Sequence, residues 1–160
     1  MRVGIGFDIH RLKAGRPLIL GGVKIPSPRG LDGHSDADVL LHALCDALLG
    51  AVGAGDIGSY FPDSDPQWKG AASRTFVEKA MERVAAAGLQ VGNADVVVVA
   101  GEPKLAPHRP AIQKALSELL QVKPDRVNVK AKTMERLGPI GEGQAIGCTA
   151  VVLLEPNGAS

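Results

Sequence analysis

The segment GIGFDIH, residues 4–10, places two residues that can bind a metal ion beside two glycines. Successive side chains of a strand point to opposite faces, so Asp8 and His10 share one face with Gly4 and Gly6. We expect the glycines to leave open space there for a metal ion or a substrate. The other face is apolar and is expected to be the core face; it consists of Val3, Ile5, Phe7 and Ile9.

A third ligand is available in residues 34–50, HSDADVLLHALCDALLG, whose apolar residues recur at helical spacing. We predict a helix that begins near Ser35 and ends at Gly50, with His42 on its polar stripe. Together with the strand pair, His42 would complete an N/O ligand set that matches zinc and leaves the fourth position open, as catalytic zinc requires. The alternatives stay open, because an isolated Asp-x-His pair is common and Ser35 could be a simple helix N-cap.

A second group of residues could bind a phosphate. Lys104 lies in a proline-rich loop, and the strand end KAKTMERLG carries Lys130, Lys132, Thr133 and Glu135. Cations, a hydroxyl and a carboxylate suit a phosphate that is bound together with a hard cation such as Mg²⁺. A solvated, charged strand end would explain the same residues.

Residues 53–70 form a stretch rich in glycine, proline and aspartate without helical or strand periodicity. A loop of this length inside a compact domain is more often functional than a mere connector, so we expect it to cover or line a site. Its carboxylates Asp56, Asp63 and Asp65 could equally be turn formers.

The remaining elements follow from periodicity and turn residues. PLILGGVKIP predicts a hairpin, residues 72–88 and 110–121 predict helices, and residues 94–101, 126–132 and 145–154 predict strands, the first of them buried on both faces. Residues 133–143 are expected to form a loop. This order predicts an α+β fold in which helices pack on one face of a mixed β-sheet, with residues 1–160 as a single domain.

Composition excludes several classes of protein. A net charge of +1 and 3% aromatic residues are atypical of nucleic-acid binding, so an anionic partner must be met locally. No apolar run approaches the ~18 residues that span a bilayer, and the first strand leaves no room for a leader segment, which predicts a cytoplasmic protein without a membrane partner. Cys45 and Cys148 form no Cys-x-x-Cys pair and are expected to be free structural thiols.

These motifs, taken together, resemble the 2-C-methyl-D-erythritol 2,4-cyclodiphosphate synthase family of the non-mevalonate isoprenoid pathway. The resemblance covers GIGFDIHRL, LILGGVKIP, GHSDADVLLHALCDALLGA, GDIGSYFPDSDP, PKLAPH and VNVKAKTMERLG, in the family's order and spacing. It implies that Asp8, His10 and His42 hold one zinc ion per subunit. It also implies that His34 and Thr133 stabilise the transition state.

The resemblance further implies how the substrate is bound. The methylerythritol phosphate portion would contact Ser35, Asp56, Ile57, Gly58 and residues 61–65, including Phe61, Asp63 and Asp65. The cytidine of a neighbouring subunit's substrate would be received by residues 100–106, including Ala100, Lys104, Leu105 and Ala106. Residues 132–135, including Lys132, would contact the diphosphate oxygens, and Glu135 would hold a Mg²⁺ or Mn²⁺ ion that bridges the diphosphate.

The implied reaction is an intramolecular phosphoryl transfer. The 2-phosphate of 4-diphosphocytidyl-2-C-methyl-D-erythritol 2-phosphate attacks the β-phosphorus, CMP leaves, and a cyclic diphosphate forms. The family assembles as homotrimers with the sheets toward the threefold axis and with active sites at subunit interfaces. The alternatives are a zinc-dependent hydrolase, with Asp38 or Asp56 as its general base, and a non-catalytic metal or nucleotide binding module.

One segment departs from the family pattern. Many members carry an aromatic residue and then an arginine in the last loop, where this chain has Pro139 and Glu142, with Gln144 nearby. Those positions are associated with an isoprenoid diphosphate bound at the trimer axis. Since Glu142 should repel such a ligand, we predict that its binding is weak or absent.

Overall fold

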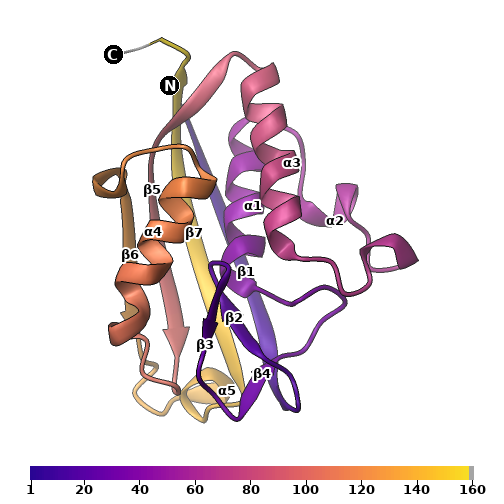
Figure 1. Cartoon of the computed structure of the whole chain (residues 1–160), viewed down its shortest axis with the longest axis vertical. Coiled ribbons are helices and arrows are strands. Elements are labelled where there is room, and N and C mark those ends of the chain that lie inside the picture. Colours follow the sequence, from indigo (N-terminus) through magenta and orange to yellow (C-terminus); the bar gives the residue numbers. More distant parts are fainter. Residues whose placement is uncertain (159–160) are drawn as a thin grey trace.

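The computed structural model describes residues 1–158 and centres on a five-stranded sheet in the order β4-β1-β7-β5-β6 (Figure 1). The strands of the sheet are β1 (Arg2–Ala14), β4 (Arg29–Leu31), β5 (Leu89–Ala100), β6 (Val127–Lys132) and β7 (Ala145–Pro156). Strands β5 and β6 run parallel and the other neighbours antiparallel, so the sheet is mixed, as predicted. The predicted hairpin is also present and joins β2 (Leu18–Leu20) to β3 (Val23–Ile25).

Three helices cover one face of the sheet: α1 (Val39–Ala51), α3 (Ser73–Ala86) and α4 (Arg109–Leu119) (Figure 1). This arrangement confirms the predicted α+β class. Two single-turn helices, α2 (Ile57–Tyr60) and α5 (Gly138–Gly141), lie in segments whose sequence predicts loops. The N-terminus and the end of β7 lie at one end of the sheet, and β4 and α5 lie at the other (Figure 1). None of the helices in residues 1–158 has the length and apolar character needed to cross a membrane.

The two glycines of β1 face helix α1 and do not border open space. A Cβ atom at Gly4 would lie 1.9 Å from the backbone oxygen of Ala47, and one at Gly6 would lie 2.0 Å from that of Ala43. The absence of side chains therefore lets α1 pack directly on the backbone of β1. The prediction of open space beside these glycines is wrong.

The apolar face of β1 is exposed in the chain. Val3, Ile5, Phe7 and Ile9 are 67%, 68%, 60% and 46% exposed. The prediction that they form the core face is wrong, because period-two alternation separates the faces of a strand without saying which one is covered. The core lies on the opposite side, between the helices and the sheet, where alternate residues of β7 are buried: Ile146, Cys148, Ala150, Val152 and Leu154. In β5 likewise, Val97 and Val99 on the outer face are only half-buried, so the prediction of burial on both faces is wrong there.

Helix α1 begins at Val39 and not near Ser35. Ala37 has a φ of 57°, which is incompatible with an α-helix, and Asp38 is the N-cap. The carboxylate of Asp38 accepts hydrogen bonds from the backbone N–H of Leu41 at 3.1 Å and from those of Gly21 and Gly22 at 2.9 and 2.7 Å. Complete burial raises the pKa of Asp38 to about 6, against the effect of these hydrogen bonds. Asp38 therefore joins the β2–β3 turn to α1. Because its carboxylate is buried and fully engaged in these hydrogen bonds, Asp38 is not available as the general base of a hydrolase.

We predict that Gly6→Ala destabilises the protein by about 3 kcal/mol, because the new methyl group overlaps the Ala43 carbonyl and overpacking typically costs about 1–3 kcal/mol. Gly50→Ala is the matched control: Gly50 also lies at the α1–β1 contact, but its Cβ would meet only the backbone oxygen of Ile5, at 3.9 Å. Since alanine favours a helix over glycine, this variant should be stabilised by up to about 1 kcal/mol. Urea unfolding of both variants measures the difference, and equal stabilities would contradict the close packing.

Candidate active site

Three side chains from β1 and α1 converge on one point. Asp8 Oδ2 lies 2.8 Å from His10 Nε2 and 3.0 Å from His42 Nδ1, and the two nitrogens are 3.1 Å apart. Tetrahedral zinc with ligand bonds of about 2.0–2.1 Å would hold its ligand atoms about 3.3 Å apart, so a slight expansion of this triangle accommodates the ion. Asp8, His10 and His42 are also the one cluster with metal-binding geometry in residues 1–158.

The remaining polar side-chain atoms of Asp8 and His10 form hydrogen bonds with backbone groups. Asp8 Oδ1 accepts the N–H of Ile9 at 2.8 Å. His10 Nδ1 lies 2.8 Å from the carbonyl oxygen of Asp32, and because a carbonyl can only accept, Nδ1 must carry the hydrogen. The lone pair of the neutral ring is then on Nε2, which faces Asp8. Two electron-rich atoms at this distance require a cation between them.

The pKa shifts of Asp8 and His10 also indicate that this cluster favours a positive charge. Burial opposes ionisation of Asp8, but hydrogen bonds from His10 and His42 outweigh it and lower the pKa of Asp8 below its usual range. Burial also opposes the charged form of His10, but the hydrogen bond with Asp8 outweighs it and raises the pKa of His10. The cluster favours a bound cation, and a proton or a divalent metal ion can supply it.

The three ligands line a cavity of about 400 Å³. Its wall includes six further residues that the sequence predicts at the active site: His34, Ser35, Ile57, Gly58, Phe61 and Asp63. The cavity is therefore built from β1, the loop before α1, α1 itself and the segment around α2. Part of the segment 53–70 therefore lines this cavity, as expected if the segment borders a site.

The carboxylates of Asp56 and Asp65 hold turns in this structure. Asp56 caps α2 and accepts the backbone N–H of Ser59 at 2.9 Å, and Asp65 accepts the N–H of Gln67 at 3.0 Å. These contacts agree with the role of turn former. The backbone of Asp65 also reaches the cavity, since its carbonyl oxygen lies 3.2 Å from His34 Nε2.

Two charged side chains position this cavity and were not singled out for that role by the sequence pattern. The guanidinium of Arg16 donates to the carbonyl oxygens of Gly33 and Ser35, at 3.1 and 2.8 Å, and so holds the loop on both sides of His34. Asp46 Oδ1 accepts the N–H of Ile57 at 2.7 Å and joins α1 to α2. Partial burial raises the pKa of Asp46. Asp46 follows His42 by one helical turn, a spacing that could have indicated it, whereas nothing local indicates Arg16.

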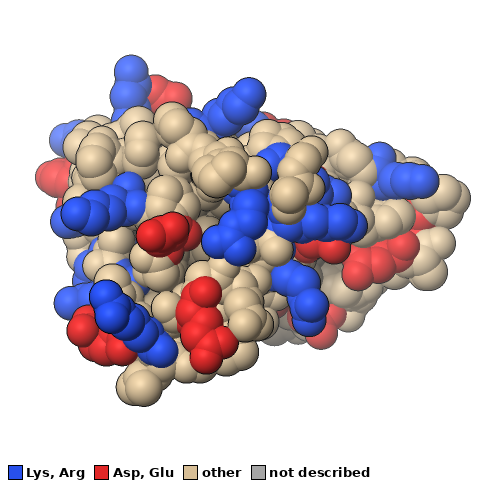
Figure 2. Space-filling model, turned by 90° about the horizontal axis from the view of Figure 1, so that it is seen from below, with Lys and Arg blue, Asp and Glu red and all other residues tan. Residues whose placement is uncertain are grey.

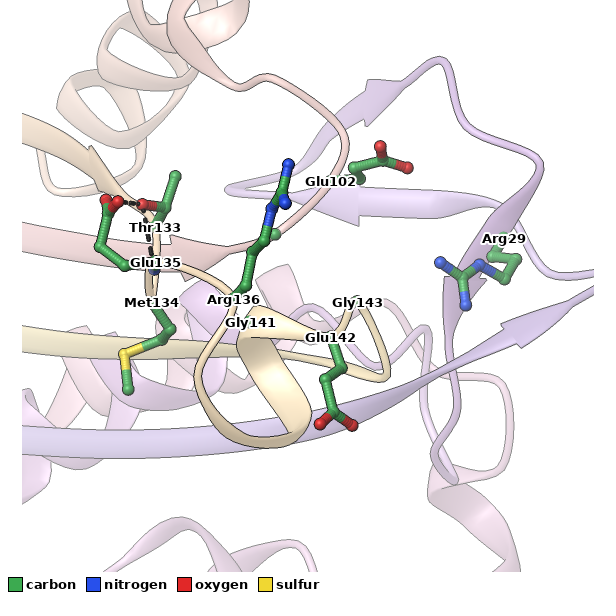
Figure 3. A pocket seen from close by; sticks show the side chains of 10 residues that line it. Arg29, Glu102, Thr133, Met134, Glu135, Arg136, Gly141, Glu142 and Gly143 are labelled. Carbon is green, nitrogen blue, oxygen red and sulfur yellow. Dashed lines mark hydrogen bonds between the residues drawn. The ribbon is translucent and has the colours of Figure 1, made fainter.

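Of the residues predicted to bind a phosphate, Thr133 and Glu135 line a second cavity, of about 640 Å³, at the end of the sheet that carries α5 (Figure 3). Thr133 Oγ1 donates to Glu135 Oε1 at 2.5 Å, and both side chains lie on the side of the cavity opposite Arg29 (Figure 3). Glu135 and Arg136 have φ values of 50° and 66°, so the chain reverses sharply here. Seen from this end, Lys and Arg side chains are interspersed with acidic ones (Figure 2), which makes any anion site a local one.

The two cavities share no residue within residues 1–158. Lys104 and Lys132 are exposed and line neither cavity, Ala100 and Leu105 are buried, and Ala106 borders a smaller hollow beside Arg109. Gly101 and Glu102 of the same loop line the second cavity. Within one chain, Asp8, His10 and His42 meet at the first cavity. Thr133 and Glu135 meet at the second cavity, and the two sets stay apart.

Comparison with known proteins agrees with this architecture. The sequence model of the YgbB family matches residues 1–155. The 2-C-methyl-D-erythritol 2,4-cyclodiphosphate synthase of Gloeobacter violaceus is 57% identical over 155 residues, which are 97% of this chain and 95% of that protein. The protein of the same name from Synechococcus sp. (strain JA-2-3B'a(2-13)) is 56% identical over 154 residues, with 96% and 98% covered.

A solved structure of 2C-methyl-D-erythritol-2,4-cyclodiphosphate synthase in a CDP-bound form has the same fold. It superposes with a TM-score of 0.89 at 47% identity and covers 96% of this chain and 100% of that one. The resemblance inferred from the motifs is thereby confirmed. The chain belongs to the YgbB family, whose relatives named above are 2-C-methyl-D-erythritol 2,4-cyclodiphosphate synthases.

Proposed function

We propose that this protein converts 4-diphosphocytidyl-2-C-methyl-D-erythritol 2-phosphate to 2-C-methyl-D-erythritol 2,4-cyclodiphosphate and CMP. The observation that carries the proposal is the convergence of Asp8, His10 and His42 on one wall of a cavity, in a chain that belongs to this family. The CDP-bound relative supports a cytidine nucleotide as part of the substrate. We also retain the prediction that the protein acts in the cytoplasm.

Asp8, His10 and His42 would hold one zinc ion, and Glu135 would hold Mg²⁺ or Mn²⁺ against the substrate diphosphate. Bound metals supply charge neutralisation and fix the phosphate oxygens in line for the transfer. The attacking 2-phosphate is already an anion, so no side chain needs to act as a general base. His34 in the first cavity and Thr133 in the second would stabilise the charge that develops on the transferred phosphoryl group.

The remaining predicted residues would position the substrate. The first cavity, with Ser35, Ile57, Gly58, Phe61 and Asp63, would hold the methylerythritol phosphate portion, assisted by Asp56 and Asp65. The segment 100–106, with Lys104, would receive the cytidine, and Lys132 would contact the diphosphate. Holding both reacting phosphates in one geometry lowers the barrier, because the entropy of bringing them together is spent on binding.

A homotrimer would unite the two cavities. The chain leaves four large apolar side chains of β1 exposed on the outer sheet face, and Val151 of β7, which pairs with Ile5, is also 38% exposed. An apolar sheet face of this kind is typical of a subunit interface. We propose that three copies bury it with their sheets toward the threefold axis, and that the second cavity of one subunit meets the first cavity of its neighbour.

A ³¹P NMR time course of the purified protein with the cytidylyl methylerythritol phosphate substrate and Mg²⁺ tests the activity. Joint appearance of CMP and a cyclic diphosphate is the expected result. CMP with an open-chain diphosphate would identify a hydrolase, and an unchanged spectrum with zinc-loaded protein would identify a binding module.

His42→Ala should reduce bound zinc from about one ion per chain to near zero and lower turnover by at least about 100-fold, with a folded protein, because it removes one of three ligands. His108→Ala is the control, since His108 lines neither cavity. Metal analysis and thermal unfolding of both variants provide the measurement. A variant that unfolds, beside a wild type without zinc, would mean that His42 is a core residue.

Thr133→Ala should lower kcat by about 10–100-fold and leave KM within about threefold, as expected for a contact that strengthens in the transition state. Thr133→Ser keeps the hydroxyl and should retain most of the rate, and Thr75→Ala on α3 serves as the neutral control. Steady-state kinetics separates the two parameters. An effect confined to KM would make Thr133 an ordinary substrate contact.

Ile5→Glu should convert a trimer into monomers at micromolar concentration, because it buries an unpaired charge at a cost of several kcal/mol. Ala111→Glu introduces the same charge on the exposed surface of α4 and should leave the trimer intact. Sedimentation velocity distinguishes the two outcomes. A monomeric wild type would refute the proposed assembly.

Isothermal calorimetry with geranyl diphosphate should show weak binding or none. Glu142 lines the second cavity, where its carboxylate accepts a hydrogen bond from Gln144 Nε2 at 2.9 Å. Arg29 and Arg136 line the same cavity, so the expected effect of Glu142 is weakened binding and not complete exclusion. Micromolar or tighter binding would contradict the prediction.

A further inference from the structure

On the side of His42 that faces away from Asp8 and His10, a network of hydrogen-bonded side chains extends to Ser73 and Asp36. His42 Nε2 lies 2.8 Å from Ser73 Oγ, the first residue of α3. Ser73 Oγ in turn makes a short hydrogen bond to Asp36 Oδ1, in the loop before α1. Ser35 Oγ is a more distant neighbour, 3.1 Å from His42 Nε2 and 3.2 Å from Ser73 Oγ.

The directions of the two hydrogen bonds that join Asp36, Ser73 and His42 follow from the atoms available. An ionised carboxylate can only accept, so the single hydroxyl hydrogen of Ser73 points to Asp36. Toward His42, Ser73 Oγ can then offer only a lone pair, and His42 Nε2 must carry a hydrogen to bond with it. In the neutral ring this leaves the lone pair on Nδ1, the atom that faces Asp8 and His10.

Burial and backbone hydrogen bonds hold this network of side chains in place. Ser73 is completely buried, and Ser35 is 5% exposed. The backbone N–H of Asp36 donates to the carbonyl oxygen of Ala71 at 2.9 Å, and that of Gly70 donates to the carbonyl oxygen of His34 at 2.8 Å. These two bonds pin the loop before α1 against the start of α3. Asp36 and Ser73 therefore meet in a fixed geometry and not through a chance contact of mobile side chains.

We propose that Asp36 and Ser73 are positioning residues for the metal ligand His42: they fix its ring orientation and keep Nδ1 free to bind the ion. The inference rests on the metal centre of the proposed function. Groups that accept the second N–H of a metal-bound histidine hold its tautomer and raise its basicity as a ligand. His10 obtains the same support from the Asp32 carbonyl, so only the His42 support can be altered through side chains.

The test is the zinc affinity of the full-length protein, measured by competition with a chromophoric chelator. Ser73→Ala should weaken zinc binding by about 10–100-fold, the usual cost of removing such a support. Ser117→Ala is the matched control, because Ser117 is also buried but donates to the Lys114 carbonyl within α4. An affinity of Ser73→Ala equal to that of Ser117→Ala would overturn the inference.

Asp36→Asn provides a second variant that keeps the size of the side chain and decides the matter if Ser73→Ala does not fold. The amide can donate to Ser73 Oγ and turn the hydroxyl hydrogen toward His42, so zinc binding should again weaken, although Asp36 has no contact with a ligand. Asp125→Asn makes the same change of charge on the exposed surface and should leave the affinity unchanged, since Asp125 lines neither cavity. Equal affinities of the Asp36 and Asp125 variants would refute the role of Asp36.

An NMR measurement reports on the hydrogen bond itself. In a ¹H–¹⁵N spectrum of the zinc-loaded protein, the Nε2 proton of His42 should exchange slowly in wild type and Ser117→Ala and faster in Ser73→Ala. A purely structural role of Ser73 would leave this exchange rate unchanged. Failure of the proposed metal centre is distinguishable, because the wild type itself would then bind no zinc.

Discussion

The close packing of helix α1 on the backbone of strand β1 is the constraint on which the rest of the site depends. Along β1, Gly4 and Gly6 face Ala47 and Ala43, so two residues of strand are matched by four residues of helix. These steps are about 6.8 Å and 6.0 Å long, which keeps the two elements in register over several turns. The same progression brings Asp8 and His10 beside His42. A methyl group at either glycine would displace the helix that carries the third ligand.

Local patterns in the sequence identify Asp8, His10 and His42, because short spacings along a strand and a helix determine which side chains share a face. Asp8 and His10 share a strand face by alternation, and helical spacing places His42 on the polar stripe of α1. The same patterns did not predict which face of β1 is covered, since that depends on what packs against the strand. Nor could they predict that Ala37 ends the helical path early, because its positive φ results from the tertiary contacts of the loop. Asp36 and Ser73 meet only because the loop before α1 lies against the start of α3.

If the two cavities are the two parts of the proposed active site, the chain needs no strong overall charge. A substrate with three phosphate groups requires several units of positive charge, but the chain carries a net charge of only +1. Neutralisation must therefore be concentrated at a few points, and bound cations provide more charge per unit volume than side chains do. Each cavity is built by its own set of residues, and the proposed homotrimer would bring the two cavities together.

The spacing of the three metal-type ligands also has a consequence for the connectivity of the chain. Asp8 and His10 are neighbours along β1, whereas His42 follows His10 after 32 residues, so an ion held by all three closes a loop that joins the first strand to the first long helix. The two cysteines are free and buried and form no such link; burial raises the pKa of Cys45 to about 12 and favours its thiol form. With an ion bound, Asp8, His10 and His42 would take the place that a disulfide occupies in many secreted domains. Such a cross-link would open on chelation and stay intact in a reducing environment.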